Sequence, residues 1–195
     1  LEQFKEAGYF DSFAYLVGNF LTNFKLRGAD LKKLKSQFTS KWFKKLFENE
    51  ADKRARAFIE IFETIYVHYQ QKLESENRVD FEDMLLKGKK FINNQNIKFL
   101  IVDEFQDISP LRAEVLKQIQ NHNKNVQLFV VGDDWQAIYG FSGGDISIIV
   151  KNFEKYFGNR NKKDLGLTYR FNQRLCELTS SFIQQNSNQL AKKIK

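Results

Sequence analysis

The chain of 195 residues is poor in the residues that disulfide-linked or metal-bound scaffolds need. It has one cysteine, Cys176, and two histidines, His68 and His122, which excludes an internal disulfide and leaves too few ligands for a structural zinc site. No run approaches the roughly 20 apolar residues of a membrane span, and residues 1–5 lack the basic and apolar regions that open a signal peptide. These absences favour a protein of the reducing cytoplasm, with no membrane as a partner.

Methionine and proline are as scarce as cysteine. The single methionine is Met84 and the chain begins with Leu1, so we expect a segment of a longer protein, with incomplete functional machinery. The single proline, Pro110, argues against long proline-rich hinges. Apolar residues make up 42% and charged residues 28% of the chain, which suffices for a packed core and excludes wholesale disorder.

Positive charge is concentrated in one stretch. The net charge is +7, and residues 25–45 hold eight Lys/Arg and one Asp, so the rest of the chain balances to zero. Phe38, Trp42 and Phe43 interleave these charges, a pattern typical of polyanion-binding surfaces. A solvated helix face with aromatic residues in the core explains the same pattern, and the segment alone favours that interpretation.

Residues 1–75 carry the apolar spacing of amphipathic helices and no strand pattern. Apolar residues recur every three or four positions over residues 10–24, again from Leu31 to Phe38 after Gly28, and again over residues 51–73. Each stretch predicts one helix with a single buried stripe. We therefore predict that this part of the chain is all helical.

The pattern changes to that of a βαβ unit. Lys98–Val102 and Val126–Val131 are short apolar runs, which predict two parallel strands buried on both faces. Between them, Ser109 and Pro110 are a helix N-cap and first helical residue. Asp164–Tyr169 is a candidate third strand, and a helix is expected over residues 171–185.

Carboxylates follow both predicted strands. Asp103, Glu104 and Asp107 come after the first, and Asp133 and Asp134 after the second. Ligands of open α/β sheets bind beyond the carboxyl ends of the strands, and an Asp directly after an apolar strand can hold a nucleotide-bound Mg²⁺. Glu104, expected on the opposite side of the strand's extension, could accept a proton from an attacking water. Acidic residues also commonly cap strands, so the pair alone is weak evidence.

Longer strings around these acids resemble the motifs of one enzyme family. Leu100–Ser109 (LIVDEFQDIS) resembles motif II, or Walker B, of superfamily 1 helicases of the UvrD/Rep/PcrA type. Val130–Gly144 (VVGDDWQAIYGFSGG) and Leu167–Asn172 (LTYRFN) are similar to motifs III and IV, and Val79–Leu86 (VDFEDMLL) to an element upstream of motif II. The motifs stand in the family's order, cover about residues 79–193, and look closest to the DNA helicase IV branch.

The resemblance implies an α/β fold: a partial RecA-like P-loop NTPase domain with a parallel sheet and an inserted all-helical subdomain. It divides the chain into three parts. Residues 1–75 would be the inserted helical subdomain, called 1B in the family, and residues 76–160 the second part of the first motor domain. Residues 161–195 would begin the second RecA-like motor domain.

The resemblance also assigns roles at the nucleotide. Asp103 would coordinate Mg²⁺, and Glu104 would be the general base for water attack on the γ-phosphate of ATP. Gln106 belongs to the motif II signature and would lie at the nucleotide. Gln136 would sense the γ-phosphate and couple it to DNA.

Further roles concern DNA and the second motor domain. Tyr139 and Phe141 would stack on bases of single-stranded DNA, although aromatic residues outside such motifs are more often part of a core. Tyr169 would lie against the adenine. Arg170 would act as an arginine finger on the transferring phosphoryl group.

A Walker A loop, G-x-x-x-x-G-K-[ST], is missing. The one Gly-Lys pair is Gly88-Lys89, and Asp83 and Lys90 stand where the loop needs glycine and Ser/Thr. The resemblance implies that the parent protein is an ATP-dependent DNA helicase acting on single-stranded and duplex DNA in the bacterial, nucleoid-associated cytoplasm. Because the Walker A loop is missing, we predict that this segment alone hydrolyses ATP negligibly. The alternatives are the helicase part of a helicase–nuclease complex and a non-catalytic nucleic-acid-binding module.

Overall fold

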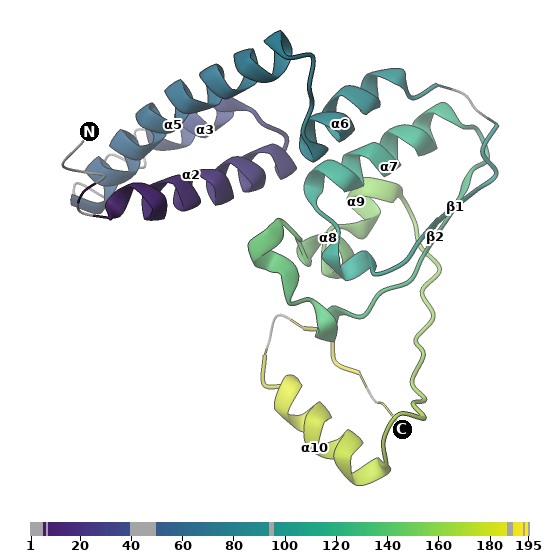
Figure 1. The fold of residues 1–195 in the computed structure, drawn as a ribbon. Helices are drawn as coiled ribbons and strands as arrows, with labels where there is room; N and C mark the ends of the chain where they lie inside the picture. The colour runs from purple at the N-terminus through teal and green to yellow at the C-terminus, as the bar shows by residue number, and fades with distance from the viewer. Residues whose placement is uncertain are drawn as a thin grey trace. The chain divides into compact units, whose positions relative to one another are not determined.

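The computed structural model describes residues 6, 8–39, 50–93, 96–186, 189–192 and 194. These form two compact units, residues 1–91 and 92–195, drawn from purple to teal and from teal to yellow (Figure 1). None of the helices in the described ranges is long and apolar enough to cross a bilayer.

The first unit is helical, as the sequence pattern predicts for residues 1–75; its last two elements lie beyond that prediction. Its elements are α2 (Tyr9–Leu26), α3 (Leu31–Thr39), α5 (Glu50–Ser75), α6 (Phe81–Gly88) and the short 3₁₀ helix η1 (Lys89–Phe91). The apolar stripes of α2 and α5 meet in a column of aromatic rings, with Phe62 fully buried and its ring centroid 4.6 Å from that of Phe20. Such edge-to-face pairs add about 0.5–1.5 kcal/mol each to the free energy of burial.

A buried lysine ties α2 to α6. Lys25 is 0% exposed, and its Nζ lies 2.6 Å from Asp80 Oδ2 and 2.8 Å from Asp83 Oδ1. Tyr69 on α5 donates its hydroxyl to the same Asp80 oxygen at 2.9 Å. Burial and this hydrogen bond raise the pKa of Tyr69 to about 12. The first lysine of the basic stretch is therefore an internal cation, which neither interpretation of residues 25–45 anticipated; Trp42 and Phe43 of that stretch lie outside the described residues, as does the side chain of Phe38.

The second unit contains the predicted βαβ unit. Strands β1 (Phe99–Val102) and β2 (Gln127–Val130) pair in parallel, with Leu100 opposite Leu128. Helix α7 (Pro110–His122) connects them, and the Ser109 hydroxyl accepts a hydrogen bond from the Arg112 amide at 3.3 Å as the predicted N-cap. The remaining elements are η2 (Phe105–Asp107), η3 (Asp134–Gln136), η4 (Tyr139–Ser142), α8 (Ser147–Val150), α9 (Phe153–Phe157) and α10 (Gln173–Ile183).

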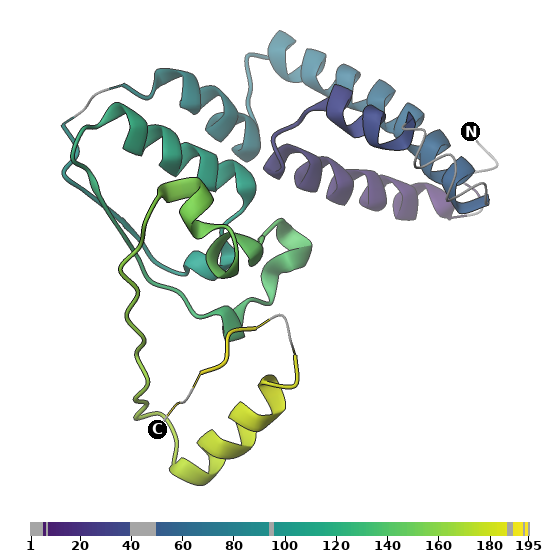
Figure 2. The same cartoon turned by 180° about the vertical axis from the view of Figure 1, so that it is seen from behind.

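Among the described residues, one face of the sheet is covered and the other is exposed, so the prediction of strands buried on both faces is wrong. Val102, Leu128 and Val130 pack against a core that includes Phe105 and Ile148. The alternate residues point away from it: Phe99, Ile101 and Phe129 are 63%, 71% and 60% exposed. Both views show α7 and α9 on the same side of the two strands (Figures 1 and 2).

The predicted third strand is also absent from the described part of this unit. Residues 159–169 are irregular, and Leu165, Leu167 and Tyr169 are 90%, 60% and 90% exposed. A strand needs a neighbouring strand to accept and donate its backbone hydrogen bonds, and no strand in the described ranges is hydrogen-bonded to residues 159–169. The helix expected over residues 171–185 is confirmed as α10, capped by Asn172, whose side chain accepts from the Leu175 amide.

Candidate nucleotide site

The carboxyl ends of β1 and β2 lie side by side and carry the acidic residues. Parallel pairing continues past both strands, since Val131 donates its amide to Val102 at 2.9 Å and Phe105 donates its amide to Val131 at 2.9 Å. The segments holding Asp103 and Asp133 are thus fixed to each other by backbone hydrogen bonds. The acids that follow the two strands therefore meet at one edge of the sheet.

Glu104 stands at a sharp turn of the backbone. Its φ of 49° and ψ of 42° lie in the left-handed region, which costs a non-glycine residue on the order of 1 kcal/mol. The Asp103 carboxylate accepts a hydrogen bond from the Glu104 amide at 2.8 Å and stabilises this turn. The expectation that Glu104 continues the strand's alternation is therefore wrong, because the chain turns here into η2.

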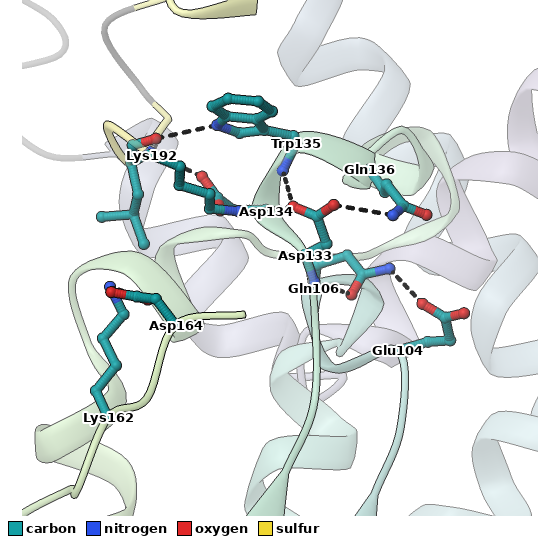
Figure 3. A network of polar contacts seen from close by, with 10 residues as sticks. Glu104, Gln106, Asp133, Asp134, Trp135, Gln136, Lys162, Asp164 and Lys192 are labelled. Carbon is teal, nitrogen blue, oxygen red and sulfur yellow. Dashed lines mark hydrogen bonds and ion pairs between the residues drawn. The ribbon is translucent and has the colours of Figure 1, made fainter. Parts of the chain in front are cut away.

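Gln106 connects the two acidic segments. It is 3% exposed, donates from Nε2 to Glu104 Oε2 at 2.8 Å and accepts at Oε1 from the Asp133 amide at 3.0 Å. A buried amide with both ends hydrogen-bonded holds a fixed orientation. Figure 3 shows this bridge from the first strand's end to the second's.

Asp133 extends the bridge to Gln136. Its Oδ2 accepts from Gln136 Nε2 at 2.9 Å, and its Oδ1 accepts from the Trp135 amide at 3.1 Å. We call Glu104, Gln106, Asp133 and Gln136 the Glu104–Gln136 network. It joins the proposed general base to the proposed γ-phosphate sensor through three hydrogen bonds.

A lysine late in the chain, which the sequence analysis did not predict as a site residue, pairs with the two aspartates that follow β2. Lys192 Nζ lies 2.6 Å from Asp133 Oδ1 and also pairs with Asp134, which is 2% exposed. Burial alone would raise the pKa of Asp133, but hydrogen bonds from Lys192 and Gln136 outweigh it and hold that pKa below its usual value. Asp134 is thus committed to Lys192 and to the Leu190 amide, 2.7 Å away, rather than turned toward a shared metal pocket.

Asp107 is a half-buried acid that ends η2, the short helix that follows Glu104. Its Oδ1 is buried and has no hydrogen-bond partner within the described ranges. Burial, followed by the charge of Glu104, raises the pKa of this carboxyl. Glu104 therefore acts on the Asp107 carboxyl through its charge.

Gly132 allows the two acidic segments to approach. A Cβ at this position would lie 2.9 Å from Gln106 Oε1, 3.0 Å from the Gln106 amide nitrogen and 3.1 Å from that of Phe105. The last two atoms belong to the backbone and cannot swing aside. Glycine here is a steric requirement of the Glu104–Gln136 network.

We expect Gly132→Ala to destabilise the chain by about 1–3 kcal/mol, because the methyl group forces Gln106 away from Asp133. Urea unfolding followed by circular dichroism measures the change. Gly140→Ala is the matched control, since a Cβ there meets nothing within 4 Å. Equal stabilities of the two variants would contradict the steric argument.

The residues present suit Mg²⁺ only together with phosphate. Across the described residues, no three His, Cys, Asp or Glu side chains are grouped as a metal site by themselves. Mg²⁺ at nucleotide sites typically takes one or two carboxylates and completes its shell with phosphate oxygens and water. Asp103, an exposed carboxylate at the end of β1, fits that requirement.

The other predicted site residues lie outside the network. Tyr139 on η4 is 48% exposed, and the side chain of Phe141 falls outside the described residues. Tyr169 is 90% exposed, and the Arg170 amide donates to Thr168 Oγ1 at 3.4 Å. In the part of the chain described, no hydrogen bond or ion pair joins Tyr169 or Arg170 to the Glu104–Gln136 network.

Comparison with known proteins gives consistent matches. Residues 8–157 match the model of the UvrD/REP helicase N-terminal domain. The chain is 46% identical over 126 residues to DNA helicase IV of Escherichia coli K12, covering 62% of this chain and 18% of that protein. It is 31% identical over 172 residues to the ATP-dependent DNA helicase Rep of Buchnera aphidicola subsp. Baizongia pistaciae, covering 81% of this chain and 25% of that protein. It is 30% identical over 147 residues to the ATP-dependent DNA helicase PcrA of Leuconostoc citreum, covering 71% of this chain and 19% of that protein. The chain thus spans about a fifth to a quarter of the length of these relatives.

Proposed function

Because the chain belongs to the UvrD/Rep helicase family, we propose that the whole protein is an ATP-dependent DNA helicase that translocates on single-stranded DNA and unwinds duplex DNA. The observation that carries this proposal is the Glu104–Gln136 network, which links the ends of the two parallel strands. We assign the protein to the bacterial cytoplasm, near the nucleoid.

Each member of the site has a chemical task in this proposal. Asp103 would hold Mg²⁺, which when bound offsets charge on the transferring phosphoryl group. Glu104 accepts a hydrogen bond from Gln106 on Oε2, and we assign its other oxygen to the proton of the attacking water. Gln106 fixes the orientation of that carboxylate. Gln136 has one amide hydrogen directed to Asp133 and a second with which to sense the γ-phosphate.

The proposal also assigns residues that would contact DNA, the adenine and the phosphoryl group. Tyr139 and Phe141 would stack on bases, Tyr169 would lie against adenine, and Arg170 would reach the phosphoryl group from the second motor domain. Residues 1–75, 76–160 and 161–195 would be the inserted subdomain, the second part of the first motor domain and the start of the second. Since the 195 residues contain no Walker A sequence, we propose that this chain alone hydrolyses ATP negligibly.

The direct test compares ATP hydrolysis by the full-length protein and by the 195-residue chain, each with and without single-stranded DNA. We expect DNA-stimulated turnover in the full-length protein only. Absence of stimulated turnover and of unwinding in the full-length protein would overturn the proposed function. Turnover by the 195-residue chain at the parent's rate would overturn only the statement that the segment is inactive.

Tyr139→Ala in the full-length protein is expected to weaken single-stranded DNA binding by about 5- to 150-fold, since a stacked ring contributes roughly 1–3 kcal/mol per base. DNA stimulation of hydrolysis should fall with it. Fluorescence anisotropy of a labelled oligonucleotide measures the affinity. Tyr139→Phe is the control, because it keeps the ring and should keep most of the affinity. Unchanged affinity in Tyr139→Ala would remove this residue from the DNA-binding surface.

A further inference from the structure

Leu190 and Lys192, which follow α10, contact η3 and the residue before it, Asp133. The Leu190 amide donates to Asp134 Oδ2 at 2.7 Å, and Trp135 donates its indole Nε1 to the Leu190 carbonyl at 3.0 Å. Lys192 adds ion pairs to Asp133 and Asp134. These contacts join residues 55 to 59 positions apart in the sequence, and Figure 3 shows Lys192 beside Asp134 and Trp135.

Lys192 is held from three sides. Its Nζ pairs with Asp133 Oδ1 and with Asp134 and lies 5.3 Å from the centroid of the Trp135 ring. Its side chain is 21% exposed. Burial alone would lower the pKa of Lys192, but its hydrogen bonds to the two aspartates raise it. The ammonium group is therefore charged and localised at neutral pH.

The carboxylate of Asp133 divides its two oxygens between Lys192 and Gln136. Oδ1 faces Lys192 Nζ at 2.6 Å, and Oδ2 accepts from Gln136 Nε2 at 2.9 Å. When one oxygen of a carboxylate is held by an ion pair, the other oxygen points in a fixed direction. Oδ1 also accepts a hydrogen bond from the Trp135 amide at 3.1 Å. Without the lysine, Asp133 keeps this longer bond but loses the shorter, charge-assisted one, so its carboxylate can rotate further and offers Gln136 a less sharply oriented acceptor.

We propose that Lys192 is a positioning residue for Gln136, acting through Asp133, so that a lysine beyond α10 controls the orientation of the γ-phosphate-sensing side chain. The role of Gln136 in this inference rests on the proposed function. The contact itself does not, since it stands on the distances and burial of Lys192, Asp133 and Gln136.

The first experiment tests the contact in the 195-residue chain. Trp42→Phe leaves Trp135 as the sole tryptophan. Quenching of its fluorescence by acrylamide then measures how accessible the Trp135 ring is beside Lys192. The side-chain NH₂ signals of Gln136 in a ¹⁵N-labelled chain, assigned by their loss in Gln136→Met, report the acceptor. Lys192→Met, Lys192→Arg and Lys162→Met are compared; the last breaks an exposed ion pair of 2.9 Å with Asp164 and is the matched control.

We expect Lys192→Met to increase quenching of Trp135 and to shift the Gln136 NH₂ signals toward those of a solvated amide. Lys192→Arg should largely restore both, because it keeps the charge, and Lys162→Met should change neither. Gln136 signals that stay unchanged in Lys192→Met would overturn the inference, even if Trp135 became more accessible.

The second experiment measures ATP hydrolysis by the full-length protein. Lys192→Met should lower kcat on the order of 10-fold to 100-fold with KM for ATP little changed, as misplacement of a positioned group does, and Lys192→Arg should recover most of kcat. Unchanged kcat in Lys192→Met, alongside lost turnover in Glu104→Gln, would overturn the inference and leave the proposed function standing. Turnover that survives Glu104→Gln would instead overturn the Glu104 assignment in the proposed function, and the NMR result would still decide the contact.

Discussion

Glu104→Gln in the full-length protein is expected to reduce ATP turnover by about 10²- to 10⁴-fold, the range supplied by a positioned general base. An amide has the size of a carboxylate but cannot accept the proton of the attacking water. Its oxygen can still accept the hydrogen bond that Gln106 donates at 2.8 Å. The Glu104–Gln136 network should therefore survive, and nucleotide binding should stay close to that of the unaltered protein.

Single-turnover hydrolysis and binding of a fluorescent ATP analogue separate these two effects. Glu154→Gln is the matched control, because it makes the same chemical change at an exposed residue of α9 that pairs with Arg160 at 3.3 Å. The control should hydrolyse ATP normally. If Glu104→Gln retained turnover within a few-fold of the control, Glu104 would not be the base.

Lys25→Met is expected to destabilise the 195-residue chain by about 3–5 kcal/mol, the usual cost of removing one partner from a buried ion pair. The change leaves Asp80 and Asp83 facing each other without the cation that lies 2.6 and 2.8 Å from them. Burial would raise the pKa of Asp80, but hydrogen bonds from Lys25, the Asp83 amide and Tyr69 hold it below its usual value. Loss of the lysine removes the strongest of these.

Urea unfolding followed at the helical circular dichroism band measures this loss. Lys53→Met, which breaks an exposed pair with Glu50 at 2.7 Å, is the control and should cost less than about 1 kcal/mol. Replacing Lys25, Asp80 and Asp83 together by Met, Asn and Asn should recover part of the stability, because no charge is then left buried between α2 and α6. Lys25→Met unfolding at the control's midpoint would contradict the assignment of a buried cation.

Local sequence patterns predict the longer helices and the positions of the two strands, but not the shorter helices α6, α8 and α9. Apolar spacing predicts α2, α3 and α5, and Ser109 and Pro110 predict the start of α7. Periodicity does not predict features that depend on contacts with residues distant in the sequence. A continuous apolar run does not reveal whether both faces of a strand are covered, so the exposure of Phe99 and Ile101 could not be predicted. The irregular path of residues 159–169 has the same cause, since a strand depends on a neighbour.

In the candidate site, too, local patterns identify some residues and long-range contacts determine the roles of others. Asp103 and Glu104 are found from their place directly after an apolar run, and the motif resemblance adds Gln136. The bridging role of Gln106 and the ion pairs of Lys192 depend on contacts 27 and 59 residues apart, which no local pattern specifies. Gly132 is the one signal in the sequence that could have indicated the bridge, because a glycine just after a strand marks a close approach of backbone.

A structure of the full-length protein with Mg²⁺ and a non-hydrolysable ATP analogue tests the central claim most directly. We predict Mg²⁺ beside Asp103, with the γ-phosphate next to Glu104 and Gln136 at the carboxyl ends of β1 and β2. A nucleotide bound elsewhere, with these side chains in contact with neither metal nor phosphate, would contradict the account.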